Sequence, residues 1–290
     1  MKAAKQSVEG MYMTEERIAQ IARTVARCPF VRGVVLGGSR ATGSATADSD
    51  VDIGVYYDPA GFDAGQLSEA ARELDDAHRP GLVCGEGGWG GWVNCGGWLT
   101  VDGCPVDLIC RDAERVRRAV EETDAGRFSA HYQPGHPHAY LDVMYRGELA
   151  CAKALCVPDA ALLALKARAQ AYPEALRGAL LDFFLFEADF SLALARKSAR
   201  GGDVYYVCGQ LFRTVSALNQ ALFALNRAYL LNEKKATLRA EGLARVPSRY
   251  RERAEAALSL SRERLAQSVE ALAALCAEVR ALAERGADGR

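Results

Sequence analysis

Two aspartates one residue apart, Asp50 and Asp52, stand at the start of the apolar run VDIGVYY, residues 51–57. In a strand, side chains two residues apart point to the same face, so the two carboxylates would project together while Val51 and Ile53 are buried on the other face. Carboxylates this close repel each other unless a cation lies between them. A hard ion such as Mg²⁺ takes oxygen ligands and keeps positions for substrate phosphates. The spacing therefore predicts a magnesium site.

A third acidic residue, Asp107, lies alone in the apolar run PVDLIC, residues 105–110. A charge in a buried strand is costly unless it has a partner. A metal site shared with Asp50 and Asp52 would supply that partner. We therefore expect the three carboxylates to converge.

A glycine turn precedes the aspartates: Gly38 and Ser39 follow the apolar run at 31–37. Glycines let the backbone approach a phosphate, and the N–H groups at a helix start attract an anion. The Ser39 hydroxyl adds a donor. Arg40 could touch a phosphate or lie in solvent, and Asp48 is expected to be a turn residue. The turn thus predicts a triphosphate cradle ten residues before the aspartate pair.

The elements that would position these residues form a mixed first half. Periodicity and turn residues predict helices at 14–28, 63–78 and 112–123, and strands at 31–37, 51–57 and 104–111. Residues 81–103 hold nine glycines and all three tryptophans, Trp89, Trp92 and Trp98. This density of glycine excludes a helix and predicts short strands joined by tight turns. The tryptophans could form walls on which a base or sugar stacks, or could pack between the turns.

The second half is predicted to be helical. Apolar spacing of three and four residues predicts helices at 140–156, 158–172, 173–199 and 203–232, and one or two more within 247–285. The stretch 126–138 carries glycine and proline and is interpreted as a linker. The domain prediction is therefore a catalytic domain at 1–125, a linker at 126–138 and an α-helical bundle at 139–290. The fold class is α+β.

Composition narrows the class of protein. The chain has 290 residues, a formal net charge of -1, and nine cysteines with no C-x-x-C pair. Scattered cysteines in apolar runs are typical of reduced thiols, and neither a signal peptide nor a membrane span is predicted, so we expect a cytoplasmic protein without membrane contact. The charge balance argues against stable nucleic-acid binding.

Four separated elements together resemble a known family. The GS pair at 38–39, the DVD triplet at 50–52 and the VDLI strand at 106–109, in this order after an N-terminal helix, resemble nucleotidyltransferases of the DNA polymerase β superfamily. The helical second half is similar to the small-molecule members, such as the aminoglycoside and lincosamide nucleotidyltransferases. The resemblance implies a mixed sheet flanked by helices, followed by a helical domain.

The resemblance also implies an activity, the transfer of a nucleoside monophosphate, usually AMP from ATP, to a hydroxyl. Asp50 and Asp52 would hold two Mg²⁺ ions, and Asp107 would share the second ion or act as the base. Gly38, Ser39 and Arg40 would contact the nucleotide. Lys234 resembles in position the helical-domain lysines that reach the triphosphate. The acceptor would be a small molecule, with antibiotics among the candidates.

Three acidic residues are candidates on the acceptor side. Glu86 lies in the glycine-rich segment, as a general base or as an exposed hairpin residue. Glu187 and Asp189 interrupt an apolar helix, where they could recognise a cationic acceptor or form ordinary ion pairs. His131, His136 and His138 invite a zinc interpretation, but no cysteine or carboxylate follows at a familiar spacing. These alternatives stay open at the level of sequence.

Other functions compete with the small-molecule transferase. A protein- or RNA-directed nucleotidyltransferase, like the antitoxins that AMPylate a toxin, would share the same motifs. A degenerate nucleotide sensor is disfavoured by the presence of all three aspartates, and polymerisation of nucleic acid by the charge balance. The sequence leaves open the acceptor, the nucleotide preference, the identity of the base, and whether two chains pair as a homodimer.

Overall fold

The computed structural model describes residues 13–43, 45–46 and 49–285, so that Asp48 lies outside the described residues. The chain divides into two compact units. The first comprises the chain up to Val120 together with Glu148–Gln170, and the second comprises Glu121–Gly147 together with Ala171 onward. Each unit is described by itself below.

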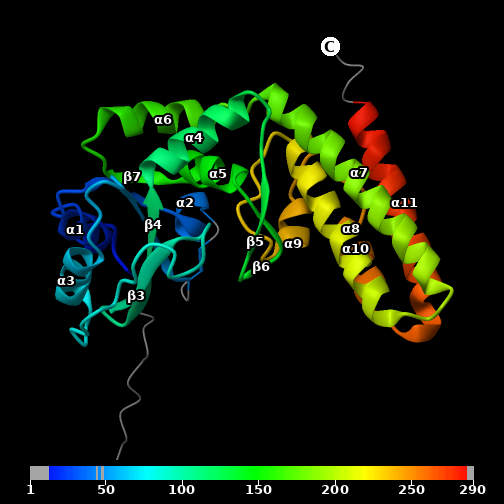
Figure 1. The fold of residues 1–290 in the computed structure, drawn as a ribbon, viewed down its shortest axis with the longest axis horizontal. Coiled ribbons are helices and arrows are strands. Elements are labelled where there is room, and N and C mark those ends of the chain that lie inside the picture. Colours follow the sequence, from blue (N-terminus) through cyan, green and yellow to red (C-terminus); the bar gives the residue numbers. More distant parts are fainter. Residues whose placement is uncertain (1–12, 44, 47–48, 286–290) are drawn as a thin grey trace, which may run out of the picture. The chain divides into compact units, whose positions relative to one another are not determined.

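The first unit combines helices and strands (Figure 1). Its elements are α1 (Glu15–Val25), β1 (Val31–Leu36), α2 (Gly38–Thr42), β2 (Val51–Tyr57), α3 (Ala64–Leu74), β3 (Cys95–Val101), β4 (Cys104–Asp112), β7 (Lys153–Cys156) and α6 (Ala160–Gln170). Two helices, α4 (Ala113–Asp124) and α5 (Val143–Cys151), contribute residues to both units.

The strands form a five-stranded mixed sheet in the order β3-β4-β2-β1-β7. β2 and β4 run parallel, whereas β1 pairs antiparallel with β2 and with β7, and β3 pairs antiparallel with β4. The end of β1 and the starts of β2 and β4 therefore meet at the same end of the sheet. The predicted mixed sheet flanked by helices is confirmed.

One face of the sheet packs into the core of the first unit. Val51, Ile53 and Val55 alternate along β2, and Leu108 and Cys110 do so on β4, all with no exposed surface. They join the apolar faces of α1 and α3 in one cluster. Because side chains alternate, the residues between them, Asp52 and Asp107 among them, lie on the opposite face.

Side chains cap the starts of three helices. The Thr14 hydroxyl accepts a hydrogen bond from the Arg17 N–H at 3.1 Å. The Asp63 carboxylate accepts from the first turn of α3 in the same way, and Asp112 accepts from the Glu114 N–H at 2.8 Å. Each cap satisfies N–H groups that have no partner within the helix. Local sequence therefore determines where these helices begin.

Two stretches contain strands where the sequence predicted none. Residues 126–138 were predicted to be a linker but contain β5 (Ala130–Gln133) and the start of β6 (His136–Leu141), which pair as an antiparallel hairpin. The single helix predicted at 140–156 is wrong: β6 ends there, α5 follows, and β7 closes the segment. The short strand β7 gains its hydrogen bonds from β1, a partner more than 100 residues earlier. Pairing at that distance overrides the helical preference of the local sequence.

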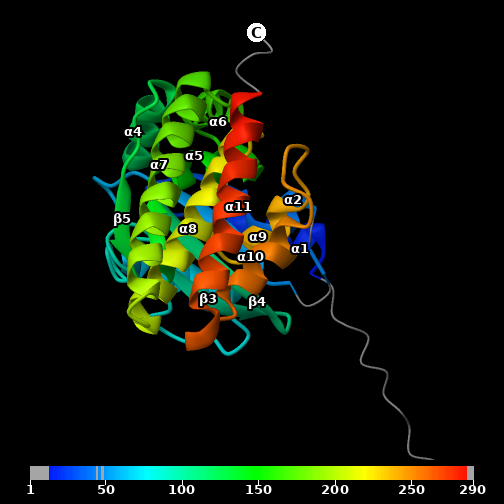
Figure 2. The ribbon, with the colours of Figure 1, turned by 90° about the vertical axis from the view of Figure 1, so that its right-hand side faces the viewer.

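The second unit is the helical part. Besides the β5–β6 hairpin it contains α7 (Glu174–Ala199), α8 (Val204–Leu225), α9 (Ala236–Ala240), α10 (Tyr250–Leu258), a 3₁₀ turn η1 (Arg262–Arg264) and α11 (Leu265–Glu284). α7 packs along α8, and α11 packs on both (Figure 2). The α+β class with a helical C-terminal region is thus confirmed. Among the described residues, none of the helices combines the length and apolarity needed to cross a membrane.

A buried arginine joins separate segments of the second unit. Arg146, 1% exposed, donates to the Tyr229 hydroxyl at 2.8 Å, to Asp124 at 2.6 Å and to the Ala171 carbonyl at 2.7 Å. These bonds satisfy a charge that would otherwise be costly to bury. The sequence carries no signal for this network, because its members are up to 105 residues apart.

Candidate active site

Two of the predicted carboxylates lie side by side. Asp52 on β2 and Asp107 on β4 are direct partners in the parallel register. Adjacent strands are roughly 4.8 Å apart, and partners in register point to the same face. Both side chains are half-buried on the face of the sheet that the apolar core leaves open. The register of β2 and β4 thus brings two of the three predicted carboxylates onto the same face of the sheet.

The glycine turn lies directly against Asp52. The Gly37 N–H donates to the Asp52 carbonyl at 2.8 Å, which joins the end of β1 to the start of β2. Gly38 has a φ of +57°, and a Cβ placed on it would stand 1.7 Å from Oδ2 of Asp52. Only glycine permits both this backbone conformation and this approach. The turn and the carboxylate therefore form one compact feature.

Arg40 contacts the backbone directly before β2. Its guanidinium donates to the Ser49 carbonyl at 2.9 Å and to the Asp50 carbonyl at 3.4 Å. Lys153 of β7 donates to the Arg40 carbonyl at 3.4 Å. These contacts connect α2 to the residues just before β2. The structure thus gives Arg40 a part in ordering the backbone at Asp50, and its predicted phosphate contact stays a prediction.

Asp50 lies one residue before β2 and is exposed. Within the part of the chain that the structure describes, no three His, Cys, Asp or Glu side chains gather closely enough to hold a metal ion. The in-register pair still suits Mg²⁺, because this ion is usually held by one or two carboxylates and completed by waters and substrate phosphates. The donor set therefore fits a magnesium ion that arrives with a nucleotide.

Two tryptophans lie on the same face as the carboxylates. On β3, Trp98 is the antiparallel partner of Asp107. Its ring stacks on that of Trp89, with centroids 4.8 Å apart and an angle of 22° between the planes. Trp98 nevertheless remains 62% exposed. The sequence left two roles open for these tryptophans, and the register now places Trp98 one strand from Asp107.

The opposite end of this face is closed by an ion pair that the sequence reasoning missed. Arg111 on β4, 4% exposed, donates to both carboxylate oxygens of Glu148, at 2.7 and 2.9 Å, and to the Val93 carbonyl. The neighbouring Tyr56 is buried, and burial followed by the Glu148 charge raises the pKa of its hydroxyl. Nothing in the local pattern around Arg111 signals a partner 37 residues later.

Glu86 is tied to the core side of the sheet. Its carboxylate accepts from the Tyr57 hydroxyl at 2.6 Å, and that hydroxyl accepts from the Asn94 amide at 2.6 Å. Tyr57 belongs to the apolar cluster beneath β2. The contact orders the glycine-rich segment, and the role of Glu86 as an acceptor-side base stays a prediction.

The other two acceptor-side candidates belong to the second unit. Glu187 of α7 lies 3.0 Å from Nε2 of His138 and is also paired with Arg213. Burial alone would raise the pKa of Glu187, but these two partners hold it below its ordinary value. Asp189 is exposed and pairs with Arg280. Ion pairing is thus the alternative that these contacts support.

The remaining predicted residues of the second unit lie around β6. Nδ1 of His136 lies 3.7 Å from Glu233, which also accepts from the His138 N–H at 2.7 Å. Burial raises the pKa of Glu233. Lys234 follows and is exposed, and its backbone N–H donates to Asn232 at 2.7 Å. Its contact with a triphosphate stays a prediction.

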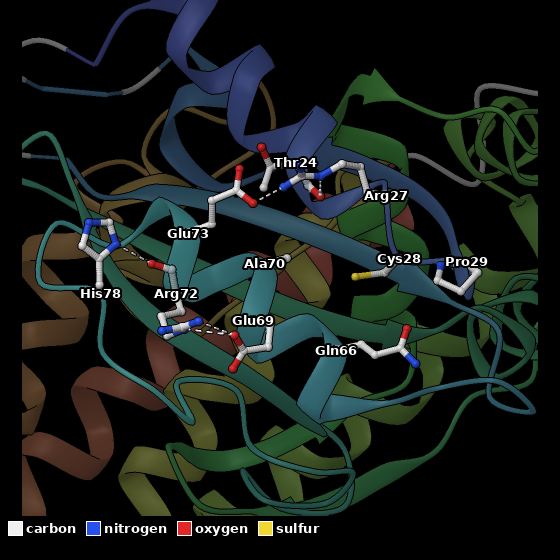
Figure 3. A pocket seen from close by; sticks show the side chains of 10 residues that line it. All are labelled: Thr24, Arg27, Cys28, Pro29, Gln66, Glu69, Ala70, Arg72, Glu73 and His78. Carbon is white, nitrogen blue, oxygen red and sulfur yellow. Dashed lines mark hydrogen bonds and ion pairs between the residues drawn. The ribbon is translucent and has the colours of Figure 1, made fainter.

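A separate hollow of about 770 Å³ lies between α1 and α3 (Figure 3). Its charged side chains pair with one another, as Arg27 does with Glu73 and Arg72 with Glu69. α1 and α3 cover the core face of the sheet, whereas the carboxylates of β2 and β4 lie on the other face. The hollow is therefore separate from the candidate site.

A protein-family model matches part of the chain. Residues 16–124 match the family model of the nucleotidyltransferase domain. The match spans α1 to α4 and thus includes Gly38, Asp52 and Asp107. It supports nucleotidyl transfer as the general class of reaction, in which a divalent metal and a nucleoside triphosphate usually take part.

One solved structure, a nucleotidyltransferase-like protein from Exiguobacterium sibiricum, is similar over 92% of this chain and 75% of its own, with 13% identity and a TM-score of 0.46. A likeness at this level carries no weight for fold or function. None of the curated proteins matches the chain.

Proposed function

We propose that the protein is a Mg²⁺-dependent adenylyltransferase that moves AMP from ATP to a hydroxyl of a small molecule. The observation that carries the proposal is the pair of in-register carboxylates, Asp52 and Asp107, with the Gly38 backbone against Asp52. The nucleotidyltransferase match over residues 16–124 supports the reaction class.

The reaction is an in-line displacement at the α-phosphorus. The acceptor oxygen forms the new P–O bond, the bond from the α-phosphorus to the bridging oxygen breaks, and pyrophosphate leaves. The hydroxyl proton passes to a base, for which Asp107 is the candidate within the site. When bound, Mg²⁺ neutralises phosphate charge and makes the attacking hydroxyl more acidic.

The residues of the chain act mainly by positioning. Asp52 and Asp107 would supply oxygen ligands to the metal, with Asp50 as a further ligand. Gly38 and Ser39 would hold the leaving phosphates, because the backbone there can be approached closely. Arg40 contacts the backbone directly before β2 through the Ser49 carbonyl. Such preorganisation accounts for most catalysis in phosphoryl transfer.

The proposal is tested with ATP labelled at either the α- or the γ-phosphate, Mg²⁺, and a panel of hydroxylated small molecules that includes aminoglycosides and lincosamides. We expect the α-label in the modified acceptor and the γ-label in pyrophosphate. Asp52→Asn and Asp107→Asn should each slow transfer at least about 100-fold, the scale of losing one preorganised electrostatic contact.

A matched control is Asp102→Asn in the turn between β3 and β4. Asp102 is exposed, pairs with Arg17, and has a φ of +50° that asparagine tolerates. Its transfer rate should stay within about twofold of the wild type, since surface ion pairs contribute little. Full activity in the Asp52→Asn, Asp107→Asn double variant would refute the site. Label that enters only protein or RNA from a lysate would refute the small-molecule acceptor.

A further inference from the structure

The stacked tryptophans occupy a defined position relative to the carboxylates. From the centre of the sheet to its edge, Asp52, Asp107 and Trp98 are successive partners in register on β2, β4 and β3. Strands are roughly 4.8 Å apart, so the Trp98 ring begins about one strand spacing beyond Asp107. The glycine turn lies on the other side of Asp52, after β1.

The stack is held in place by its surroundings. Gly96 lies on the same face as Trp98, and a Cβ there would stand 2.4 Å from two edge atoms of the Trp89 ring, so the edge of this ring lies close to the bare backbone of β3. The Trp89 N–H donates to the Asn94 carbonyl at 2.8 Å, which closes the loop that carries the ring. On β3 itself, the Trp98 carbonyl accepts from Arg79 at 3.3 Å.

The Trp98 ring keeps much of its surface open although it has a stacking partner. It is 62% exposed, with Trp89 as its support. Tryptophan offers an apolar, electron-rich face on which planar rings and sugar faces stack. The stack is thus preorganised for a flat ligand.

The in-line geometry of the reaction indicates whether the nucleotide or the acceptor lies next to the tryptophan stack. The attacking and leaving oxygens lie on opposite sides of the α-phosphorus. If the phosphates leave toward the glycine turn at the end of β1, the acceptor must approach from the side of β4 and β3. Trp98 lies on that side of the carboxylates.

We propose that Trp98, supported by Trp89, is the platform on which the acceptor stacks, and that the acceptor carries a planar ring next to its reactive hydroxyl. This inference rests on the proposed function, because that function determines the direction from which the acceptor arrives. Trp98 determines the specificity for the acceptor and does not contribute to ATP binding.

The probes are phenyl β-D-glucoside and methyl β-D-glucoside, which share their hydroxyls and differ in the ring. Binding is followed by tryptophan fluorescence with Mg²⁺ and α,β-methylene-ATP present. We expect the wild type to bind the phenyl compound at least about tenfold more tightly, the scale of one ring stack. Trp98→Ala should abolish this preference, and Trp98→Phe should retain part of it. The affinity for α,β-methylene-ATP should be the same in all three proteins.

Trp92→Ala is the matched control, since Trp92 lies in the same segment but meets Arg115, whose guanidinium carbon is 5.4 Å from the ring centre. This variant should bind both glucosides as the wild type does. Equal binding of the two glucosides by the wild type, no binding of either, or an unchanged preference in Trp98→Ala would overturn the inference. The inference would also be overturned if Trp98→Ala lost affinity only for α,β-methylene-ATP, because Trp98 would then stack on adenine. Absence of pyrophosphate release despite a Trp98-dependent preference would count against the proposed function alone.

Discussion

The contact between Gly38 and Asp52 joins the turn that we propose to bind phosphate to the carboxylate that we propose to bind the metal. Gly38→Ala would place a methyl group 1.7 Å from Oδ2 of Asp52, at a φ of +57°. The carboxylate would have to move by more than an ångström. We predict that pyrophosphate release falls about 100-fold, since displacements on this scale cost that much in positioned chemistry. A steady-state assay with ATP and Mg²⁺ measures it.

The variant Gly43→Ala tests whether backbone strain or the collision with Asp52 causes the loss of activity in Gly38→Ala. Gly43 ends α2 with a φ of +76°, and a Cβ there would have nothing within 4 Å. Both variants should lose about 1 kcal/mol of unfolding free energy from the left-handed backbone, but Gly43→Ala should keep its activity within about twofold. An equal loss of activity in the two variants would show that the Asp52 contact is unimportant.

At the residue scale, the sequence predicted which strands carry the acidic residues better than it predicted which residues pair with one another. The spacing of Asp50 and Asp52 and the lone Asp107 indicated two neighbouring strands, and the register brings Asp52 and Asp107 together. The sequence did not predict that Trp98 pairs with Asp107 or that Arg111 meets Glu148. Register and ion pairing depend on how strands slide and helices dock, which local patterns do not encode.

At the element scale, α3 is anchored to the edge strand that carries Trp98. Asp75 ends α3, is fully buried, and accepts from Arg79 at 2.6 Å and from the Thr100 N–H of β3 at 2.9 Å. The pKa of this carboxyl lies well below its ordinary value, mainly because of the Arg79 guanidinium and then because of the Thr100 N–H. The carboxylate thus stabilises the fold in its charged form.

The sign of the pH dependence follows from that depressed pKa. The stabilisation is fully present above the unfolded value of about 4 and is lost as the pH falls toward the folded value. We predict that Asp75→Asn lowers the unfolding free energy by about 2 kcal/mol at pH 6, and that the difference from the wild type shrinks at pH 3. Urea unfolding at the two pH values measures both quantities.

Glu69→Gln provides the comparison, because Glu69 pairs with Arg72 on the surface of the same helix. It should change the unfolding free energy by less than about 1 kcal/mol. A deficit in Asp75→Asn that is the same at both pH values would mean that the charge of Asp75 is not what stabilises the junction.

Elements with local signals were predicted, and those made by distant pairing were not. Thr14, Asp63 and Asp112 cap helices that begin where the sequence indicated. By contrast, β7 at Lys153–Cys156 lies in a stretch with helical periodicity and becomes a strand because β1 offers an edge. α8 ends at Leu225, earlier than the predicted 232, where Arg227 turns the chain with a φ of +52°.

At the scale of the whole molecule, the sequence predicted the change from mixed helices and strands to helices alone. The residues that make up each compact unit were harder to predict. The chain returns to the first unit at Glu148–Gln170 after a hairpin in the second. The nucleotidyltransferase match covers residues 16–124 and thus lies almost wholly in the first unit. The predicted contact of Lys234 with the triphosphate requires that the second unit takes part in nucleotide binding. It stays a prediction.

The central claim is that Asp52 and Asp107 hold a divalent cation together with a nucleotide. Electron paramagnetic resonance of Mn²⁺, added with α,β-methylene-ATP, tests it without need of an acceptor. Because Mn²⁺ takes the same oxygen ligands as Mg²⁺, we predict that the wild type binds Mn²⁺ at least about tenfold more tightly when the analogue is present. In the folded Asp52→Asn, Asp107→Asn double variant this gain should disappear. A double variant that binds Mn²⁺ and the analogue as tightly as the wild type would contradict the claim.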